Sequence, residues 1–286
     1  MTVIRGVVLL VLAAVLAVSC QTAVSGKDLA KEYYNLGNAY FAVKKYREAI
    51  QFYERTLEYD EYATKAAFNM AYSYIVLGDA VKGIAILEEL LTTDPANSTL
   101  HSLIAYAYHL QGKDDQAIAV YQKILSIQPE ERDALYNLGV IYRGRKNYSQ
   151  AEESFRSLIK KNPDDLVAIF TLAEVLMDQQ KYAEAIDFLN RYLESKPENT
   201  DAYLLLARAY TMREQYLDAL DTYEKVLAVN SRLRDAWFRR ADILLTKAED
   251  PDRGYTALEQ ALELGFTDQQ AIVALVKGVN ESQLLD

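Results

Sequence analysis

A 34-residue period of small side chains constrains this chain more than any other feature of its sequence. Positions 34 residues apart hold only glycine or alanine, and they are Gly37, Ala71, Ala105, Gly139, Ala173, Ala207 and Ala241. Self-similarity at a fixed period of this length is the sequence signature of stacked structural repeats. Because the phase is kept without an insertion over this whole stretch, the sequence predicts an array of equivalent units.

Other positions of the repeat keep the same phase. A large residue stands three places after the small one, at Tyr40, Tyr74, Tyr108, Tyr142, Leu176, Tyr210 and Leu244. A second small residue follows at Ala49, Gly83, Ala117, Ala151, Ala185 and Ala219, and a second large one at Tyr53, Leu87, Tyr121, Phe155, Leu189 and Tyr223. Proline closes the middle units at Pro95, Pro129, Pro163 and Pro197.

These residue types indicate a pair of helices in each unit. Apolar residues recur at steps of three and four, which is the pattern of an amphipathic helix. A glycine or alanine where two helices cross lets the backbones approach, and a ring on the facing helix fills the space beside it. Each hairpin leaves one face unburied, so its stability depends on a neighbouring hairpin.

The repeat resembles the tetratricopeptide repeat, and residues 33–40 (YYNLGNAY) lie near the consensus of that family. The resemblance implies an all-α fold, a right-handed superhelical solenoid of seven hairpins over residues 28–265. It also implies that the first helix of each hairpin lines a concave side. The resemblance therefore predicts a shared groove along the first helices.

The same phase identifies the residues expected in this partner-binding groove. Aromatic and amide side chains dominate the candidates, which are Tyr34, Asn35, Asn38, Phe68, Asn69, Tyr72, Tyr106, Tyr136, Asn137 and Phe170. An asparagine side chain offers both a donor and an acceptor, so it could bind the backbone of an extended peptide. Asparagine is also usual at this place in the family, where it could serve hydrogen bonding between repeats, and the sequence leaves both interpretations open.

The C-terminal end departs from the strict period. The turn at 249–252 carries one extra residue, which puts the second helix of the seventh hairpin at about residues 253–264. Residues 267–277 then show the pattern of one more amphipathic helix, with Thr267 as its expected N-cap. We expect residues 266–286 to form a capping helix and a tail, because terminal repeats need a cover.

The N-terminus has the layout of an export signal. One basic residue, Arg5, precedes an apolar run over residues 6–18, which is too short to span a membrane. Residues 16–20 (LAVSC) resemble a bacterial lipobox, although Ala17 stands where leucine is usual. This resemblance implies a signal peptide over residues 1–19, a lipidated Cys20 and a short tether over residues 20–27. The alternatives are an ordinary signal peptide and an uncleaved anchor.

Gln21 follows the cysteine, and by resemblance to enterobacterial sorting this implies an outer-membrane lipoprotein that faces the periplasm. The formal net charge is -10, and clustered Lys and Arg of the kind that bind phosphate backbones are missing from the sequence. We therefore expect no nucleic-acid partner.

Catalytic, cofactor and metal sites are not expected. The two histidines, His101 and His109, lie eight residues apart on one predicted helix, too far apart in rise to share a metal. His101 is interpreted as a core residue. Acidic pairs at 114–115, 130–131, 152–153 and 164–165 are interpreted as solvated surface. No phosphate-binding glycine loop or nucleophile elbow is present.

Two hypotheses of function follow. The first is a non-enzymatic scaffold at the bacterial envelope, which binds partner proteins or extended peptides in its groove and takes part in assembling an envelope complex. The second is an accessory protein for small-molecule uptake, which docks a solute-binding protein or transporter. The sequence does not identify the partner or the oligomeric state.

Overall fold

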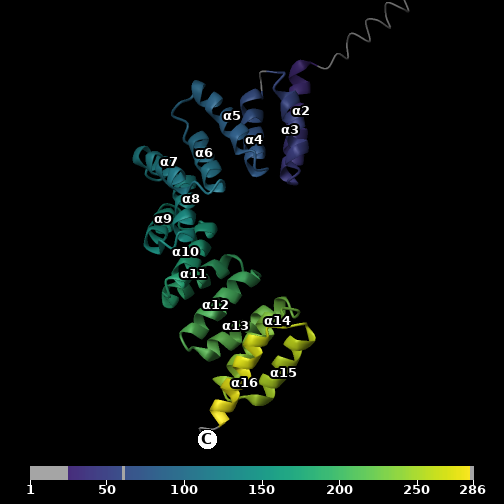
Figure 1. Cartoon of the computed structure of the whole chain (residues 1–286), viewed down its shortest axis with the longest axis vertical. Helices are drawn as coiled ribbons and strands as arrows, with labels where there is room; N and C mark the ends of the chain where they lie inside the picture. Colours follow the sequence, from purple (N-terminus) through teal and green to yellow (C-terminus); the bar gives the residue numbers. More distant parts are fainter. Residues whose placement is uncertain (1–24, 60–61, 284–286) are drawn as a thin grey trace, which may run out of the picture. The chain divides into compact units, whose positions relative to one another are not determined.

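The protein was analysed as a computed structural model that describes residues 25–59 and 62–283. Within these residues the chain forms 15 α-helices and no strand, so the predicted all-α class is confirmed (Figure 1). The helices form two compact units, of which unit 1 ends at Pro129 and unit 2 begins at Glu130. The repeat period does not predict this division, and each unit is described by itself.

Unit 1 contains three helical hairpins. The first pairs α2 (Gly26–Ala42) with α3 (Tyr46–Thr56), and the second pairs α4 (Ala63–Val76) with α5 (Ala80–Thr93). The third pairs α6 (Ser98–Leu110) with α7 (Asp114–Ile127). Ser25 and Asn97 begin α2 and α6 as N-caps, and each side chain accepts a hydrogen bond from the first turn of its helix.

Unit 2 contains four hairpins and one further helix. The hairpins pair α8 (Arg132–Gly144) with α9 (Tyr148–Lys161), α10 (Leu166–Asp178) with α11 (Tyr182–Ser195), α12 (Thr200–Met212) with α13 (Tyr216–Val229), and α14 (Arg234–Thr246) with α15 (Pro251–Glu263). The last helix, α16 (Gln269–Gln283), packs against α14. The predicted seven hairpins and the additional C-terminal helix are all present among the described residues.

The packing inside the hairpins follows the prediction that a small residue of the first helix lies beside a large residue of the second. A Cβ added at Gly37 would lie 2.5 Å from the ring of Tyr53, and one added at Gly139 would lie 2.8 Å from the ring of Phe155. Tyr53, Tyr121 and Phe155 are fully buried. The small residue is therefore required because a buried side chain of the second helix occupies the space beside it.

The turns inside the hairpins also repeat. A residue with positive φ stands at Lys44, Gly78, Gly112, Lys146, Gln180, Glu214 and Glu249. The spacing is 34 residues up to Glu214 and 35 for the last step, so the extra residue predicted in the seventh turn is present. Left-handed backbone costs a residue other than glycine about 1 kcal/mol; the hairpins that turn at Gly78 and Gly112 avoid this cost, and the other five tolerate it.

The C-terminal elements differ from the prediction in their boundaries. Helix α15 begins at Pro251, two residues earlier than expected, because Asp250 caps it and proline fits the first helical position. The N-cap of α16 is Asp268 and not Thr267, since the Asp268 side chain accepts from the Ala271 N–H at 3.0 Å. Leu275 of α16 is buried with Phe238, Leu245 and Ala261, so the helix covers the last hairpin as predicted.

Candidate functional site

One hollow in unit 1 brings together several residues that the sequence assigns to the groove. It has a volume of about 400 Å³ and is lined by Tyr34 of α2 and by Phe68 and Asn69 of α4. The rest of its lining comes from the start of α4 and from the junction of α5 and α6, and consists of Thr64, Lys65, Leu90, Thr93, Asp94, Asn97, Thr99 and Leu100. We call this hollow the unit 1 groove. All three hairpins of unit 1 contribute to it.

The asparagines beside this groove are bonded to each other. Asn69 Nδ2 donates to Asn38 Oδ1 at 3.0 Å, and the Tyr53 hydroxyl donates to the same oxygen at 2.8 Å. Burial raises the pKa of Tyr53 to about 12, so this hydroxyl keeps its proton. Asn38 therefore joins the first two hairpins, which is the inter-repeat interpretation of these residues.

The same pair keeps hydrogen-bonding capacity for a ligand. Within the described residues, Asn38 Nδ2 and Asn69 Oδ1 make no hydrogen bond. They offer one donor and one acceptor next to each other, and both side chains are half-buried. A peptide unit presents the complementary acceptor and donor. The two interpretations of asparagine are thus compatible, because one half of each amide stabilises the repeat and the other half stays available.

A row of rings runs across the three hairpins of unit 1. The Tyr72 ring lies 5.3 Å from Phe41 and 6.4 Å from Tyr46, and it stacks on Tyr106 at 6.4 Å with an interplanar angle of 11°. All four rings are half-buried, and burial raises the pKa of Tyr72. Each ring is thus positioned by a ring of the neighbouring hairpin while part of its surface faces solvent.

The remaining predicted residues lie elsewhere. Asn35 is exposed on α2, outside the groove lining. Tyr136, Asn137 and Phe170 belong to unit 2 and are half-buried. Tyr136 packs on Phe155 at 5.7 Å and Phe170 on Tyr192 at 5.1 Å, so these rings partly serve the packing of their own hairpins.

Charged residues of the first helices in unit 2 bind one another. The Arg143 guanidinium of α8 bonds Glu174 at 2.8 Å and Asp178 at 2.7 Å, both on α10. Arg132 bonds Asp165 at 2.9 Å, and Asp165 also caps α10 through the Ala168 N–H. Asp165 is only 6% exposed, so its interpretation as solvated surface is wrong.

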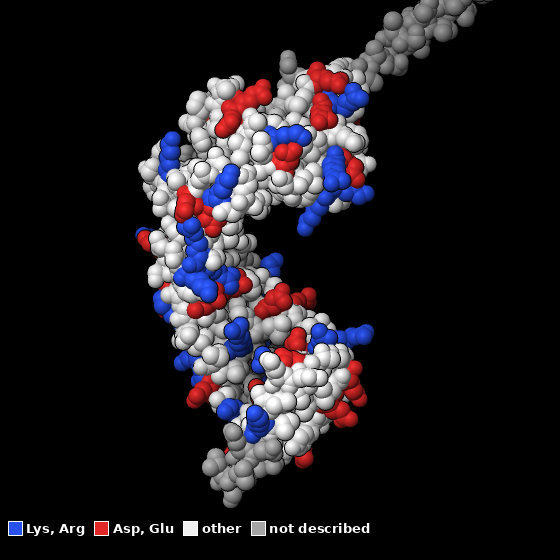
Figure 2. All heavy atoms as spheres, viewed as in Figure 1, with Lys and Arg blue, Asp and Glu red and all other residues white. Residues whose placement is uncertain are grey.

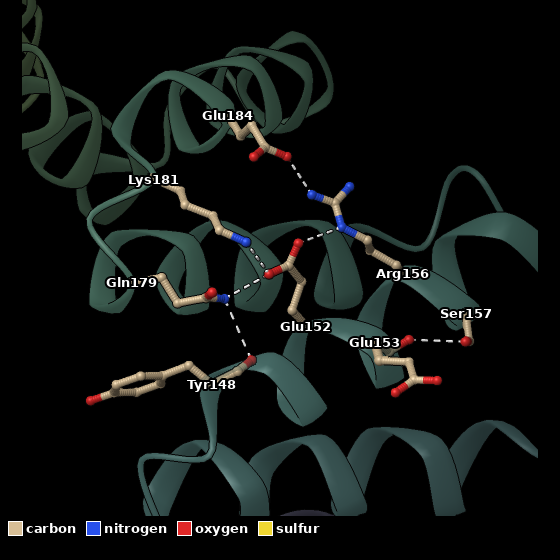
Figure 3. Close-up of polar contacts among 8 residues, drawn as sticks. All are labelled: Tyr148, Glu152, Glu153, Arg156, Ser157, Gln179, Lys181 and Glu184. Carbon is tan, nitrogen blue, oxygen red and sulfur yellow. Dashed lines mark hydrogen bonds and ion pairs between the residues drawn. The ribbon is translucent and has the colours of Figure 1, made fainter.

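A polar network on α9, α11 and the turn between α10 and α11 was also missed by the sequence. Figure 3 shows the Glu152 carboxylate between three donors, which are Arg156 Nε at 2.7 Å, Gln179 Nε2 at 2.7 Å and Lys181 Nζ at 2.8 Å. Arg156 continues to Glu184. Burial would raise the pKa of Glu152, but these hydrogen bonds outweigh it and lower the pKa to about 2.

The histidines have structural partners. His109 Nδ1 lies 2.6 Å from Asp114 Oδ1. His101 is half-buried, and its Nε2 lies 2.9 Å from the Pro95 carbonyl oxygen, so it is not a full core residue. In the described part of the chain, no cluster of three or more His, Cys, Asp or Glu residues could hold a metal ion.

The surface charges are mixed. On the face that Figure 2 shows, acidic and basic side chains are interspersed over both units. None of the described helices is both long enough and apolar enough to cross a membrane. Cys20 and the signal segment lie outside the described residues.

Comparisons with known proteins agree with the repeat assignment. Tetratricopeptide repeat models match residues 30–62 and, in overlapping segments, residues 77–138, 108–174, 142–209 and 176–237. These matches cover more than half of the chain. No curated protein matches the sequence significantly.

Solved structures show the same fold at low identity. The C-terminal part of a tetratricopeptide protein from Cytophaga hutchinsonii is 19% identical, with a TM-score of 0.67 over 84% of this chain and 98% of that one. YrrB, described as a tetratricopeptide protein with an unusual peptide-binding site, is 17% identical, with a TM-score of 0.59 over 66% of this chain and 96% of its own.

PilF from Pseudomonas aeruginosa is 18% identical, with a TM-score of 0.57 over 78% of this chain and 98% of its own. At such identities the likeness concerns the fold alone. The sequence matches, the repeated hairpins and the small-to-large packing nevertheless agree: the chain belongs to the tetratricopeptide repeat family, whose members mediate protein–protein interactions.

Proposed function

We propose that this protein is an exported, lipid-anchored adaptor that binds an extended peptide segment of a partner protein in the unit 1 groove. The observation that carries the proposal is the groove itself, which three hairpins line with two rings, the Asn69 amide and helix ends, and beside which Asn69 is bonded to Asn38. Its volume of about 400 Å³ lies within the range of sites that bind small ligands.

The chemistry of the groove fits a peptide backbone flanked by apolar side chains. Asn38 Nδ2 and Asn69 Oδ1 match the carbonyl and the N–H of one peptide unit, while Tyr34 and Phe68 offer apolar ring surface. Lys65 and Asp94 place one charge of each sign in the lining. Such a mixed lining suits an uncharged or weakly charged segment better than a highly charged one.

The lipid anchor is a separate part of the proposal and rests on the sequence at Cys20. Helix α2 begins at Gly26, so the folded chain would start within a few residues of a lipidated cysteine. The sequence predicts a tether that ends at Lys27, but Gly26 and Lys27 are already helical, which leaves Gln21 to Ser25 as the tether. These five residues span at most ~18 Å, which would hold unit 1 close to the membrane surface. We place the adaptor at the periplasmic face of the outer membrane, in the assembly of an envelope complex.

Blocking the groove tests the binding site. Thr64→Trp introduces a bulky ring at an exposed position of the lining, and Thr256→Trp is the matched control on α15. The tagged full chain is used to capture partners from a detergent extract of the envelope. We expect Thr256→Trp to retain the captured proteins and Thr64→Trp to lose them.

A second variant addresses the row of rings beside the groove. Tyr72→Ala with Tyr106→Ala removes the stacked pair, and it is expected to weaken capture of the same proteins. If both the blocked variant and this double variant retain every partner, binding takes place elsewhere. For the anchor, Cys20→Ala is expected to abolish labelling by a fatty-acid probe, and unchanged labelling would exclude lipid attachment at this residue.

A further inference from the structure

The first hairpin exposes on its outer face an apolar side chain whose apolar counterparts are buried where another hairpin of the same unit precedes them; Arg240, a charged counterpart, is half-buried. The residue immediately before the repeated small residue is Met70 or Ile104 in unit 1 and Leu172 or Leu206 in unit 2, and none of these is more than 7% exposed. Each of them follows another hairpin of its own unit. Leu36 occupies the same position on α2 and is 43% exposed.

Helix α2 and its C-cap residue Val43 present a continuous apolar stripe on this face. Its members alternate steps of four and three residues, and they are Leu29, Tyr33, Leu36, Tyr40 and Val43. This spacing is that of the contact seam between two packed helices. Val43, at the end of the stripe, is 64% exposed.

The two tyrosines of the stripe are held from the side by rings of α3 and of the segment that follows it. Tyr33 stacks on Tyr59 at 6.5 Å, and Tyr40 stacks on Phe52 at 5.3 Å. All four rings remain half-buried, so these contacts widen the apolar surface without covering it. Figure 1 shows α2 and α3 at one end of unit 1, where no described helix lies on their outer side.

The last hairpin, in contrast to the first, is covered by a helix of the same chain. Helix α16 covers the last hairpin, with Leu275 only 3% exposed beside Phe238 and Leu245. The chain thus supplies its own cover for the last hairpin, while no described element covers the first. A second molecule therefore cannot continue the array by stacking a bare last hairpin on the bare first one.

The geometry points to a two-fold contact between two copies of this chain through α2. Leu36 lies at the centre of the stripe, with Leu29 and Val43 seven residues away on either side. In an antiparallel pair, Leu36 would face Leu36 of the second copy and Leu29 would face its Val43. A surface that matches itself in this way is what a two-fold dimer requires.

The backbone dipole of α2 favours the same arrangement. In an antiparallel pair, the N-terminus of each helix, with its partial positive charge, lies next to the partially negative C-terminus of the other. The contact lies outside the unit 1 groove and does not depend on what the groove binds.

A charge exchange at position 36 tests the contact, because at a two-fold axis this residue faces itself. Leu36→Glu and Leu36→Lys are each made in the full chain, kept in non-ionic detergent, and studied by analytical ultracentrifugation. We expect each variant alone to raise the dimer dissociation constant at least about thirtyfold, as a residue at the centre of an interface does. Mixing the two variants should restore a dimer, now a heterodimer.

The matched control is Val81→Glu, which places the same charge at a position that is 78% exposed on α5. It should leave the dissociation constant unchanged. A monomeric wild-type chain, or a mixture of the two charged variants that stays monomeric, would overturn the inference. Helical content measured by circular dichroism establishes that each variant is folded.

Photocrosslinking identifies what covers the face in the cell. A photoreactive phenylalanine analogue at position 36 of the full chain should give a product of twice the chain mass, joined to residues 29–43 of the second copy. The analogue at position 81 should not. Crosslinks from position 36 only to another protein, to lipid, or to residues 1–24 of the same chain would each reject the dimer.

Discussion

Glu152→Gln is the perturbation that tests the energetics of this fold most directly. The substitution keeps the shape of the side chain and removes its charge, while Arg156 and Lys181 stay in place. Lowering the pKa from its usual value of 4.5 to about 2 corresponds to about 3 kcal/mol in favour of the carboxylate. Arg156 and Lys181 are 41% and 42% exposed, so solvent screens them and we expect a loss of about 1–2 kcal/mol.

The pH dependence of the unfolding free energy tests whether the charge of Glu152 is responsible for this loss. A carboxyl whose pKa is lowered by folding stabilises the folded state above its unfolded pKa, and that contribution is lost as the pH falls through the folded value. The contribution of Glu152 should therefore be complete above about pH 5 and nearly absent at pH 2. The difference in stability between wild type and Glu152→Gln should decrease over this interval.

The assay is urea unfolding followed by circular dichroism at several pH values. Because stacked repeats can unfold in steps, hydrogen exchange on α9, α10 and α11 supplies the local free energy of opening. Glu153→Gln is the control, since Figure 3 shows its carboxylate pointing away from the network. Equal stability of the two variants at pH 7, or a difference that persists at pH 2, would refute the reasoning.

Gly37→Ala, with Gly144→Ala as its control, and Arg240→Leu test the packing between helices. Gly37→Ala should destabilise unit 1 by about 1–2 kcal/mol, because its Cβ would lie 2.5 Å from the buried Tyr53 ring, whereas Gly144→Ala, with open space around its Cβ, should be neutral or stabilising by up to about 0.5 kcal/mol. Thermal unfolding of both variants compares the two sites, and equal destabilisation would argue against a clash. Arg240→Leu should stabilise unit 2 by about 1 kcal/mol, because Arg240 Nε is buried without a hydrogen-bond partner and burial lowers the pKa of this side chain. A lower melting temperature would show instead that its bond to Glu224 and its contact with Trp237 outweigh the cost of burial.

The repeat phase predicted what depends on local sequence and on the crossing of paired helices. Gly37 beside Tyr53 and Gly139 beside Phe155 follow from the phase alone, because a hairpin of fixed length brings those positions together in every repeat. The extra residue before Glu249 could be counted in the same way. These contacts and this turn length can be predicted without knowing the conformations of the long polar side chains.

The polar contacts between hairpins could not be predicted in this way. Glu152 binds Gln179 and Lys181 in the turn of the next hairpin, 27 and 29 residues away. Both donors recur in an earlier repeat, at Gln111 and Lys113, but the position of Glu152 holds isoleucine or leucine in the rest of the first six repeats, so the phase gives no carboxylate there. An acidic pair in the sequence indicates a solvated surface unless the donors around it are known. Asp268, rather than Thr267, begins α16 for a related reason, since two neighbouring capping residues differ only in backbone geometry.

The repeat phase predicted only part of the lining of the unit 1 groove. The phase placed Tyr34, Phe68 and Asn69 on facing first helices, and the structure brings them to one hollow. It did not predict Leu90 and Thr93, which come from the end of a second helix, or the bond that joins Asn38 to Asn69. A repeat position says which element a residue lies on, whereas the ends of α5 and α6 decide how deep the hollow is.

The repeat phase also explains why the first hairpin exposes an apolar face although its sequence follows the repeat. Leu36 obeys the repeat as well as Met70 does, and the two differ only because a hairpin precedes Met70. A periodic sequence therefore specifies the same contact surface at every step, including the step where the described chain has no helix to fill it. Burial of that surface has to come from outside the described helices. Leu36 marks the surface, because it is more exposed than the residues at the same position of later repeats.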